Sequence, residues 1–117
     1  MQNILVVDDE IELSKLYQQE LRDEGFNVMV ANDGFEAINL AQKNTIDLVV
    51  LDIKMAGMDG LEVLNEFRMK NADIPVILNS AYSTYKDDFS TWLADAYVVK
   101  SSNLDELKNK IRELLKI

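Results

Sequence analysis

The sequence predicts a single α/β domain in which helices cover both faces of a mostly parallel β-sheet. Five short apolar runs alternate with longer segments of helical hydrophobic periodicity, the order of elements typical of this class. The first, third and fourth runs are continuously apolar over most of their length, as strands buried on both faces are. The length of 117 residues fits one compact domain, which we expect to span residues 1–117.

The five apolar runs are the predicted strands. They cover residues 3–7, 26–31, 47–52, 74–80 and 96–100. The third, "DLVVLD", is the most hydrophobic of them. Parallel strands joined by right-handed crossovers bring their carboxyl ends to one edge of the sheet, where ligand sites of such folds lie.

Periodic apolar residues predict a helix after each strand. The residues expected to face inward in the first three helices are Leu13, Leu16, Tyr17 and Leu21, then Phe35, Ile38 and Ala41, and then Leu61, Leu64 and Phe67. Gly25 is expected just past the end of the first helix, where a glycine often closes a helix. Asp33 is expected to be the N-cap of the second.

The last two predicted helices differ in the strength of their pattern. Residues 83–93 are rich in Ser, Thr and Asp and form a weak helical pattern anchored by Phe89 and Trp92. The final helix has a clear apolar stripe, formed by Leu104, Leu107, Ile111 and Leu114. Asn103 and Glu106, three residues apart, predict a start that resembles a capping box.

Composition excludes several classes of function. The chain has no Cys and no His, so it offers no disulfide, no thiolate or imidazole metal ligand and no Ser-His-Asp triad. A net charge of −9 argues against a nucleic-acid partner for this domain. No apolar run is long enough to span a membrane, and the N-terminus lacks the basic region of a signal peptide. We therefore expect a cytoplasmic protein.

Polar side chains follow the predicted strands at their carboxyl ends. Asp8 and Asp9 follow the first strand, Asp52 ends the third, Ser80 ends the fourth and Lys100 ends the fifth. Each has a local interpretation when taken alone: a turn or helix cap for the aspartates, a backbone hydrogen bond for the serine, a solvated charge for the lysine. Side chains of this kind at the ends of four of the five strands instead predict a functional site at one edge of the sheet.

The charges at this edge predict a cation. Three carboxylates brought close together repel one another, and one lysine leaves two negative charges uncompensated. An all-oxygen ligand set that needs only one or two carboxylates favours Mg²⁺. A divalent cation beside a carboxylate that can attack phosphorus defines a phosphoryl-acceptor site.

Four separated motifs carry a family resemblance: "VVDDE", "LDIKMAGMDG", "NSA" and "AYVVK". Together, over the whole chain, they resemble the receiver domain of two-component response regulators. The resemblance implies a flavodoxin-like (βα)5 domain whose five parallel strands have the order 2-1-3-4-5, with helices on both faces. This fold agrees with the pattern of elements described above.

The resemblance also implies a role for each residue of the acidic edge. Asp52 matches the phosphorylated aspartate. Asp9 matches a direct ligand of Mg²⁺ (or Mn²⁺), together with Asp52 itself, and Asp8 matches the neighbour that contacts the metal through water. Lys54 would contribute its backbone carbonyl to the metal.

Further positions match residues that respond to the phosphoryl group. Ser80 matches the switch hydroxyl, Lys100 the lysine that pairs with the acyl phosphate, and Tyr97 the switch aromatic. Lys54, Ala81 and Tyr82 match the positions that tune the lifetime of the phosphoryl group.

The implied function is a phosphorelay switch and not a turnover enzyme. A sensor histidine kinase or a phosphotransfer protein would donate the phosphoryl group. The surface of the fourth helix, fifth strand and fifth helix would then engage a downstream protein or an output domain. The resemblance also implies possible homodimerisation on activation. The chain is expected to be either a stand-alone receiver or a fragment of a longer regulator.

Two alternatives from other classes remain open. A degenerate receiver would bind partners without being phosphorylated. A haloacid-dehalogenase-like phosphatase would also form an aspartyl phosphate, but it requires an aspartate two residues after the acceptor, where this chain has Lys54.

The sequence departs from the family pattern at two positions. Ala56 replaces the usual proline, which predicts a looser loop after Asp52. Ser101 follows Lys100 where the family has a proline after a cis peptide bond. Because a cis bond before a non-proline residue is unfavourable, we expect a trans Lys100–Ser101 bond.

Overall fold

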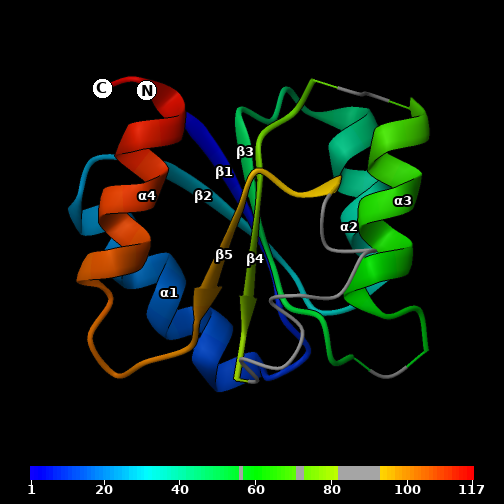
Figure 1. Ribbon diagram of the computed structural model, residues 1–117, viewed down its shortest axis with the longest axis horizontal. Coiled ribbons are helices and arrows are strands. Elements are labelled where there is room, and N and C mark those ends of the chain that lie inside the picture. The colour runs from blue at the N-terminus through cyan, green and yellow to red at the C-terminus, as the bar shows by residue number, and fades with distance from the viewer. Residues whose placement is uncertain (56, 71–72, 82–92) are drawn as a thin grey trace.

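The computed structural model describes residues 1–55, 57–70, 73–81 and 93–117, and they form one parallel sheet with helices on both faces (Figure 1). The strands lie in the order β2-β1-β3-β4-β5, as predicted. Their bounds are Asn3–Val7 for β1, Asn27–Ala31 for β2, Leu48–Leu51 for β3, Val76–Ser80 for β4 and Ala96–Val99 for β5. Each strand lies within a residue or two of its predicted range.

Two pairs of helices cover the two faces of the sheet (Figure 1). Helices α1 (Ile11–Asp23) and α4 (Asp105–Leu115) pack on one face. Helices α2 (Gly34–Lys43) and α3 (Gly60–Lys70) pack on the other. The helix predicted over residues 83–93 lies outside the described residues except for Leu93. No helix in the described ranges is both long and apolar enough to cross a membrane.

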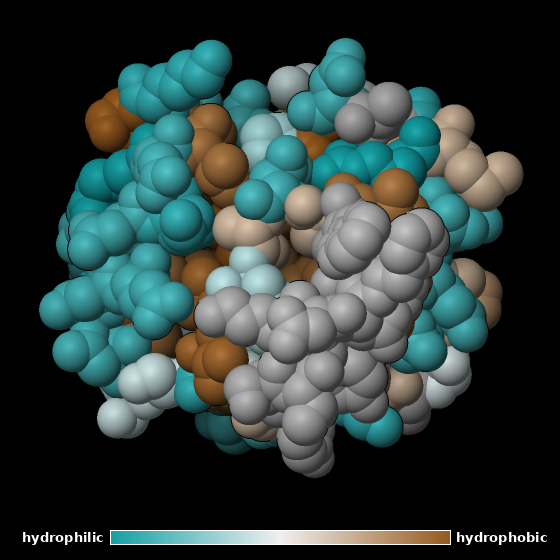
Figure 2. Space-filling view, viewed as in Figure 1, coloured by the Kyte–Doolittle hydropathy of each residue, from teal (hydrophilic) through white to brown (hydrophobic). Residues whose placement is uncertain are grey.

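Alternation along the strands divides the apolar residues into two cores. In β1, Ile4 and Val6 face the core shared with α1 and α4, whereas Leu5 and Val7 face the core shared with α2 and α3. All residues of β3 and β4 are buried, which confirms the prediction that these strands have no solvated face. Figure 2 shows hydrophilic side chains over the outer surface on the side of α4 and apolar ones toward the middle of the view.

Two helix ends follow the sequence prediction. Gly25 has a φ of +98° and its N–H donates to the carbonyl of Arg22, while the N–H of Phe26 donates to the carbonyl of Leu21. These two bonds form the Schellman motif that closes α1. The side chain of Asp33 accepts a hydrogen bond from the N–H of Glu36 and caps α2 as predicted.

Three local predictions are wrong. Leu16 and Phe35 are 52% and 66% exposed instead of facing inward. Buried Gly34 and Ala37 set the inner face of α2, and at about 100° per residue Phe35 points away from it. The capping box at Asn103 does not form. The N-cap of α4 is the buried Leu104, and the Asn103 side chain accepts from the N–H of Asp105.

Helix α3 begins against the backbone that follows β3. The N–H of Gly60 donates to the carbonyl of Ile53 at 2.8 Å. A Cβ atom at Gly60 would stand 2.0 Å from the carbonyl oxygen of Asp52. Only a glycine allows this approach, which fixes the segment that carries Asp52.

We expect Gly60→Ala to lower the free energy of unfolding by about 1–3 kcal/mol, because the added methyl group meets backbone that cannot rotate away. Urea unfolding measures the loss. Asn65→Ala, at an exposed position of the same helix, is the matched control, and it should change stability less. Unchanged stability of Gly60→Ala would contradict the close packing of α3 on this loop.

Candidate functional site

The register of the central strands makes Asp8 and Asp52 neighbours. Val7 of β1 pairs with Leu51 of β3, and the next residue on each strand is an aspartate. The N–H of Asp52 donates to the carbonyl of Val7 at 2.9 Å, which extends the ladder to this point. The two side chains are only 1% and 5% exposed, so the sheet holds two carboxylates in its interior.

Asp9 completes an acidic cluster with these two residues. Asp8, Asp9 and Asp52 each contribute a carboxylate oxygen to a group in which all such atoms lie within 4.8 Å of one another. Asp9 is exposed, whereas the other two are buried. The cluster predicted from the strand ends is therefore present, with one side open to solvent.

Lys100 crosses the sheet to reach this cluster. Its Nζ lies 2.9 Å from Oδ2 of Asp8, 3.4 Å from Oδ2 of Asp52 and 3.9 Å from Oε1 of Glu10. Its backbone N–H donates to the carbonyl of Ser80 at 2.7 Å, which fixes the point where its side chain departs. One ammonium thus compensates part of the charge of two buried carboxylates.

Burial controls the ionisation of these groups. Burial raises the pKa of Asp52 from 3.8 to about 6, with Lys100 opposing this shift and Asp8 adding to it. For Lys100, burial alone would lower the pKa, but the hydrogen bond to Asp8 and the charge of Asp52 raise it above its ordinary value. The lysine therefore stays charged, and the cluster keeps a negative surplus.

Asn32 holds the loop that carries the acidic pair. Its Nδ2 donates to the backbone carbonyl of Asp8 at 2.8 Å and to Oγ of Ser14 at 3.1 Å. Oδ1 of Asp8 accepts from the N–H of Glu10 at 2.9 Å, so the carboxylate is fixed by both of its oxygens. Nothing local in the sequence indicates the contact of Asn32 with Asp8, which lies 24 residues away.

The other predicted residues lie around the same edge. Ser80 is fully buried at the end of β4, and Ala81 after it is exposed. Tyr97 of β5 is partly buried against the core shared with α2 and α3. Lys54 is exposed in the loop after β3.

Three sequence predictions concern the loops of this edge. Tyr82 and Ala56 lie outside the described residues, so their roles stay predictions. The Lys100–Ser101 peptide bond is trans, as expected, since the described residues contain no cis peptide.

The donor set fits a hard divalent cation. Its ligand atoms are all carboxylate oxygens, and three carboxylates against one ammonium leave two negative charges. The open side at Asp9 leaves room for the water ligands that Mg²⁺ retains. The residues present therefore fit Mg²⁺ binding at Asp8, Asp9 and Asp52.

Fold and site together define the class of the protein. The family model for the response regulator receiver domain matches residues 4–112, and the chain belongs to this family. The structure is similar to response regulator protein TrrA from Thermotoga maritima in complex with Mg²⁺–BeF, with a TM-score of 0.95 and 49% identity over 97% of this chain and 99% of that one. It is also similar to a chain in a complex of histidine kinase ThkA with TrrA, with a TM-score of 0.93 and 50% identity over 98% and 99%.

Curated relatives are longer than this chain. The probable transcriptional regulatory protein TcrX of Mycobacterium tuberculosis is 38% identical over 97% of this chain, which covers 49% of TcrX. The transcriptional regulatory protein ZraR of Klebsiella oxytoca is 37% identical over 97% of this chain, which covers 26% of ZraR. The chain thus spans between about a quarter and a half of these relatives.

We expect Asp52→Asn to stabilise the metal-free protein at pH 7.5. The folded protein keeps the Asp52 proton up to about pH 6, whereas the unfolded chain releases it near 3.8, so stability falls as the pH rises between these values. The ionised carboxylate therefore lowers stability above pH 6 by up to about 3 kcal/mol, which an amide avoids.

Urea unfolding at pH 7.5 and pH 4 measures this effect. The gain from Asp52→Asn should be clear at pH 7.5 and small at pH 4, where Asp52 is protonated in the folded protein. Added Mg²⁺ should raise the melting temperature of the wild type more than that of Asp52→Asn, because it binds the folded carboxylate cluster. A variant that is equally or less stable at both pH values would contradict the burial of an uncompensated charge.

Proposed function

We propose that this receiver domain is a signalling switch that accepts a phosphoryl group on Asp52 from the phosphohistidine of a sensor histidine kinase or a phosphotransfer protein. One observation carries the proposal: the Asp52 carboxylate is held in place by the sheet, between the carboxylates of Asp8 and Asp9 and the ammonium of Lys100. The complexes of TrrA with Mg²⁺–BeF and with histidine kinase ThkA support it, since this chain is about half identical to TrrA.

Phosphoryl transfer to Asp52 needs a nucleophilic oxygen and positive charge near the phosphoryl oxygens. An Asp52 carboxylate oxygen attacks phosphorus, a P–O bond forms, and the P–N bond to the donor imidazole breaks, so the electron pair leaves with the imidazole. Asp9, Asp52 and the backbone carbonyl of Lys54 would hold Mg²⁺ or Mn²⁺, with Asp8 acting through water, and the cation would supply positive charge to the phosphoryl oxygens. Lys100, already 3.4 Å from Asp52, pairs with an oxygen of the group once it is attached.

Acceptance would shift the receiver between two conformations. The added charge attracts the hydroxyl of Ser80, whose carbonyl is already bonded to the N–H of Lys100, and the space vacated admits Tyr97. The surface of β5, α4 and the segment before β5 would change and engage a downstream protein, an output domain or a second copy. On this proposal the domain modifies only itself and is not a turnover enzyme, and it acts in the cytoplasm.

The first test is covalent modification. Wild-type protein incubated with Mg²⁺ and acetyl phosphate should gain the mass of one phosphoryl group, measured by intact-protein mass spectrometry. Asp52→Ala should gain none, because both oxygens of Asp8, the other buried carboxylate, are already engaged by the N–H of Glu10 and the ammonium of Lys100. Wild type without a mass gain, or an equal gain in Asp52→Ala, would reject the proposal and favour the degenerate receiver.

A second test concerns the lifetime of the phosphoryl group. Tyr82 matches a family position that controls the access of water, so Tyr82→Gly should change the hydrolysis rate of the phosphorylated protein. The decay of the phosphoryl mass after removal of acetyl phosphate measures it, with Met69→Gln, on the exposed side of α3, as the control. An unchanged rate in Tyr82→Gly would remove Tyr82 from the mechanism.

A further inference from the structure

Asn79 stands in the same row of the sheet as the two buried aspartates. Leu51 of β3 pairs with Leu78 of β4, so the residues that follow them, Asp52 and Asn79, are lateral neighbours on the same face. Asp8 is the neighbour of Asp52 on the other side. The Asn79 side chain is only 2% exposed. A buried amide therefore extends the row of carboxylates into the interior of the sheet.

The side chain of Lys100 has to cross this row. Lys100 follows the edge strand β5, yet its Nζ reaches Asp8, which follows β1, and β4 and β3 lie between these two strands. Neighbouring strands are about 4.8 Å apart, so the lysine runs over the ends of β4 and β3. It does so on the face that Val98, two residues earlier on β5, shares with α1 and α4. This is also the face that Asn79 occupies.

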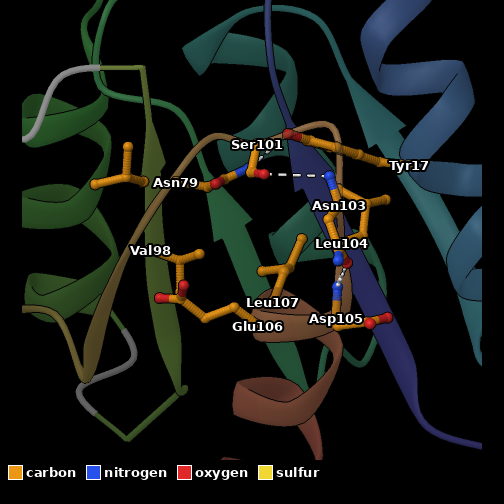
Figure 3. A pocket seen from close by; sticks show the side chains of 10 residues that line it. Tyr17, Asn79, Val98, Ser101, Asn103, Leu104, Asp105, Glu106 and Leu107 are labelled. Atoms are coloured by element: carbon orange, nitrogen blue, oxygen red, sulfur yellow. Dashed lines mark hydrogen bonds between the residues drawn. The ribbon is translucent and has the colours of Figure 1, made fainter.

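Tyr17 of α1 orients the amide of Asn79. Nδ2 of Asn79 donates to the Tyr17 hydroxyl at 3.0 Å, between residues 62 positions apart. Figure 3 shows the two side chains reaching toward one another at one end of a cavity of about 220 Å³, which is also lined by Ser101 and Leu104. The hydrogen bond therefore sets the orientation of the amide beside this cavity.

The pair is also within electrostatic reach of the acceptor. Burial raises the pKa of the Tyr17 hydroxyl, so it stays protonated, and the charges of Lys100, Asp8 and Asp52 all act on it. A purely structural interpretation is that the hydrogen bond ties α1 to β4. Replacing both partners of such a bond with apolar groups of the same shape is often nearly neutral for stability. The structural interpretation therefore predicts that folded variants accept the phosphoryl group at the wild-type rate.

We propose that Asn79 and Tyr17 are positioning residues for phosphoryl acceptance. Their polar groups lie beneath the side chain of Lys100 and fix the position of its ammonium relative to the Asp52 carboxylate. The inference rests on the proposed function of Asp52. It assigns to α1 and β4 a role in the site that is distinct from the carboxylates and from Ser80, whose side chain alternates to the opposite face of β4.

The test compares Tyr17→Phe, Asn79→Leu and the double variant. The rate of phosphorylation by acetyl phosphate at saturating Mg²⁺ should fall about tenfold in each single variant, the scale of losing a residue that orients a ligating side chain. The double variant should be no slower than the slower single one, because the pair acts as a unit. The dissociation constant for Mg²⁺, measured by calorimetry, should not weaken, since the carboxylates stay in place.

Gln18→Met is the matched control. Gln18 is the next residue of α1, and its Nε2 donates to the carbonyl of Val28 at 3.0 Å, so the substitution also removes one hydrogen bond between α1 and the sheet. Its phosphorylation rate should equal that of the wild type. Thermal unfolding confirms that each variant is folded, and Tyr17→Phe, which loses only a hydroxyl, keeps the test valid where Asn79→Leu does not fold.

Three results would overturn the inference. Folded single variants that accept the phosphoryl group at the wild-type rate would leave the pair a purely structural role. An equal loss of rate in Gln18→Met would assign the effect to a loosened α1. A wild-type protein that takes up no phosphoryl group would overturn the proposed function together with this inference. Failure of the inference alone is recognised because the wild type and the variants are then phosphorylated at the same rate.

Discussion

The burial of Asp52 beside Asp8 is the constraint on which the rest of the site depends. Two adjacent strand ends bring two carboxylates into the interior, where like charges repel and neither is fully hydrated. The side chain of Lys100 crosses two strands, and its ammonium contacts both carboxylates. It compensates only part of the charge of these two groups. The uncompensated negative charge destabilises the folded site, and the same charge would attract a divalent cation.

Each neighbouring element contributes a contact that keeps these charges in place. Asn32, after β2, holds the backbone of Asp8. Gly60 lets α3 begin directly against the carbonyl of Asp52. The site is thus assembled by the sheet edge as a whole, and the loops around it are fixed by hydrogen bonds between segments that are distant in sequence.

The two faces of the sheet give the site two different surroundings. On one face, Tyr97 packs on the core with α2 and α3, and Ser80 ends β4. On the other face, Asn79 and Tyr17 introduce a polar hydrogen bond into the core shared with α1 and α4. A phosphoryl group on Asp52 would therefore act at a boundary between two separately packed cores. On the proposed function, the face with Ser80 would carry the switch and the face with Asn79 would position the lysine.

Much of the fold and part of the site could be predicted from the sequence. Apolar periodicity is a local property, so it identified the strands, the four helices among the described residues and the edge at which Asp8, Asp9, Asp52 and Lys100 meet. It failed at Phe35, because the rotation of α2 is set by how closely Gly34 packs on Val63 and Met58, which lie 29 and 24 residues away in sequence. A helical pattern alone does not contain that contact.

By itself, the sequence determined the class of fold, the order of its elements and the residue types at the acidic edge, because hydrophobic pattern and short motifs encode these locally. Only the tertiary structure decided which side chains share a row of the sheet. Asn79 is a lateral neighbour of Asp52, and Tyr17 meets it from a helix 62 positions earlier. Strand register and helix rotation arise from packing across the whole domain, so no local pattern specifies them.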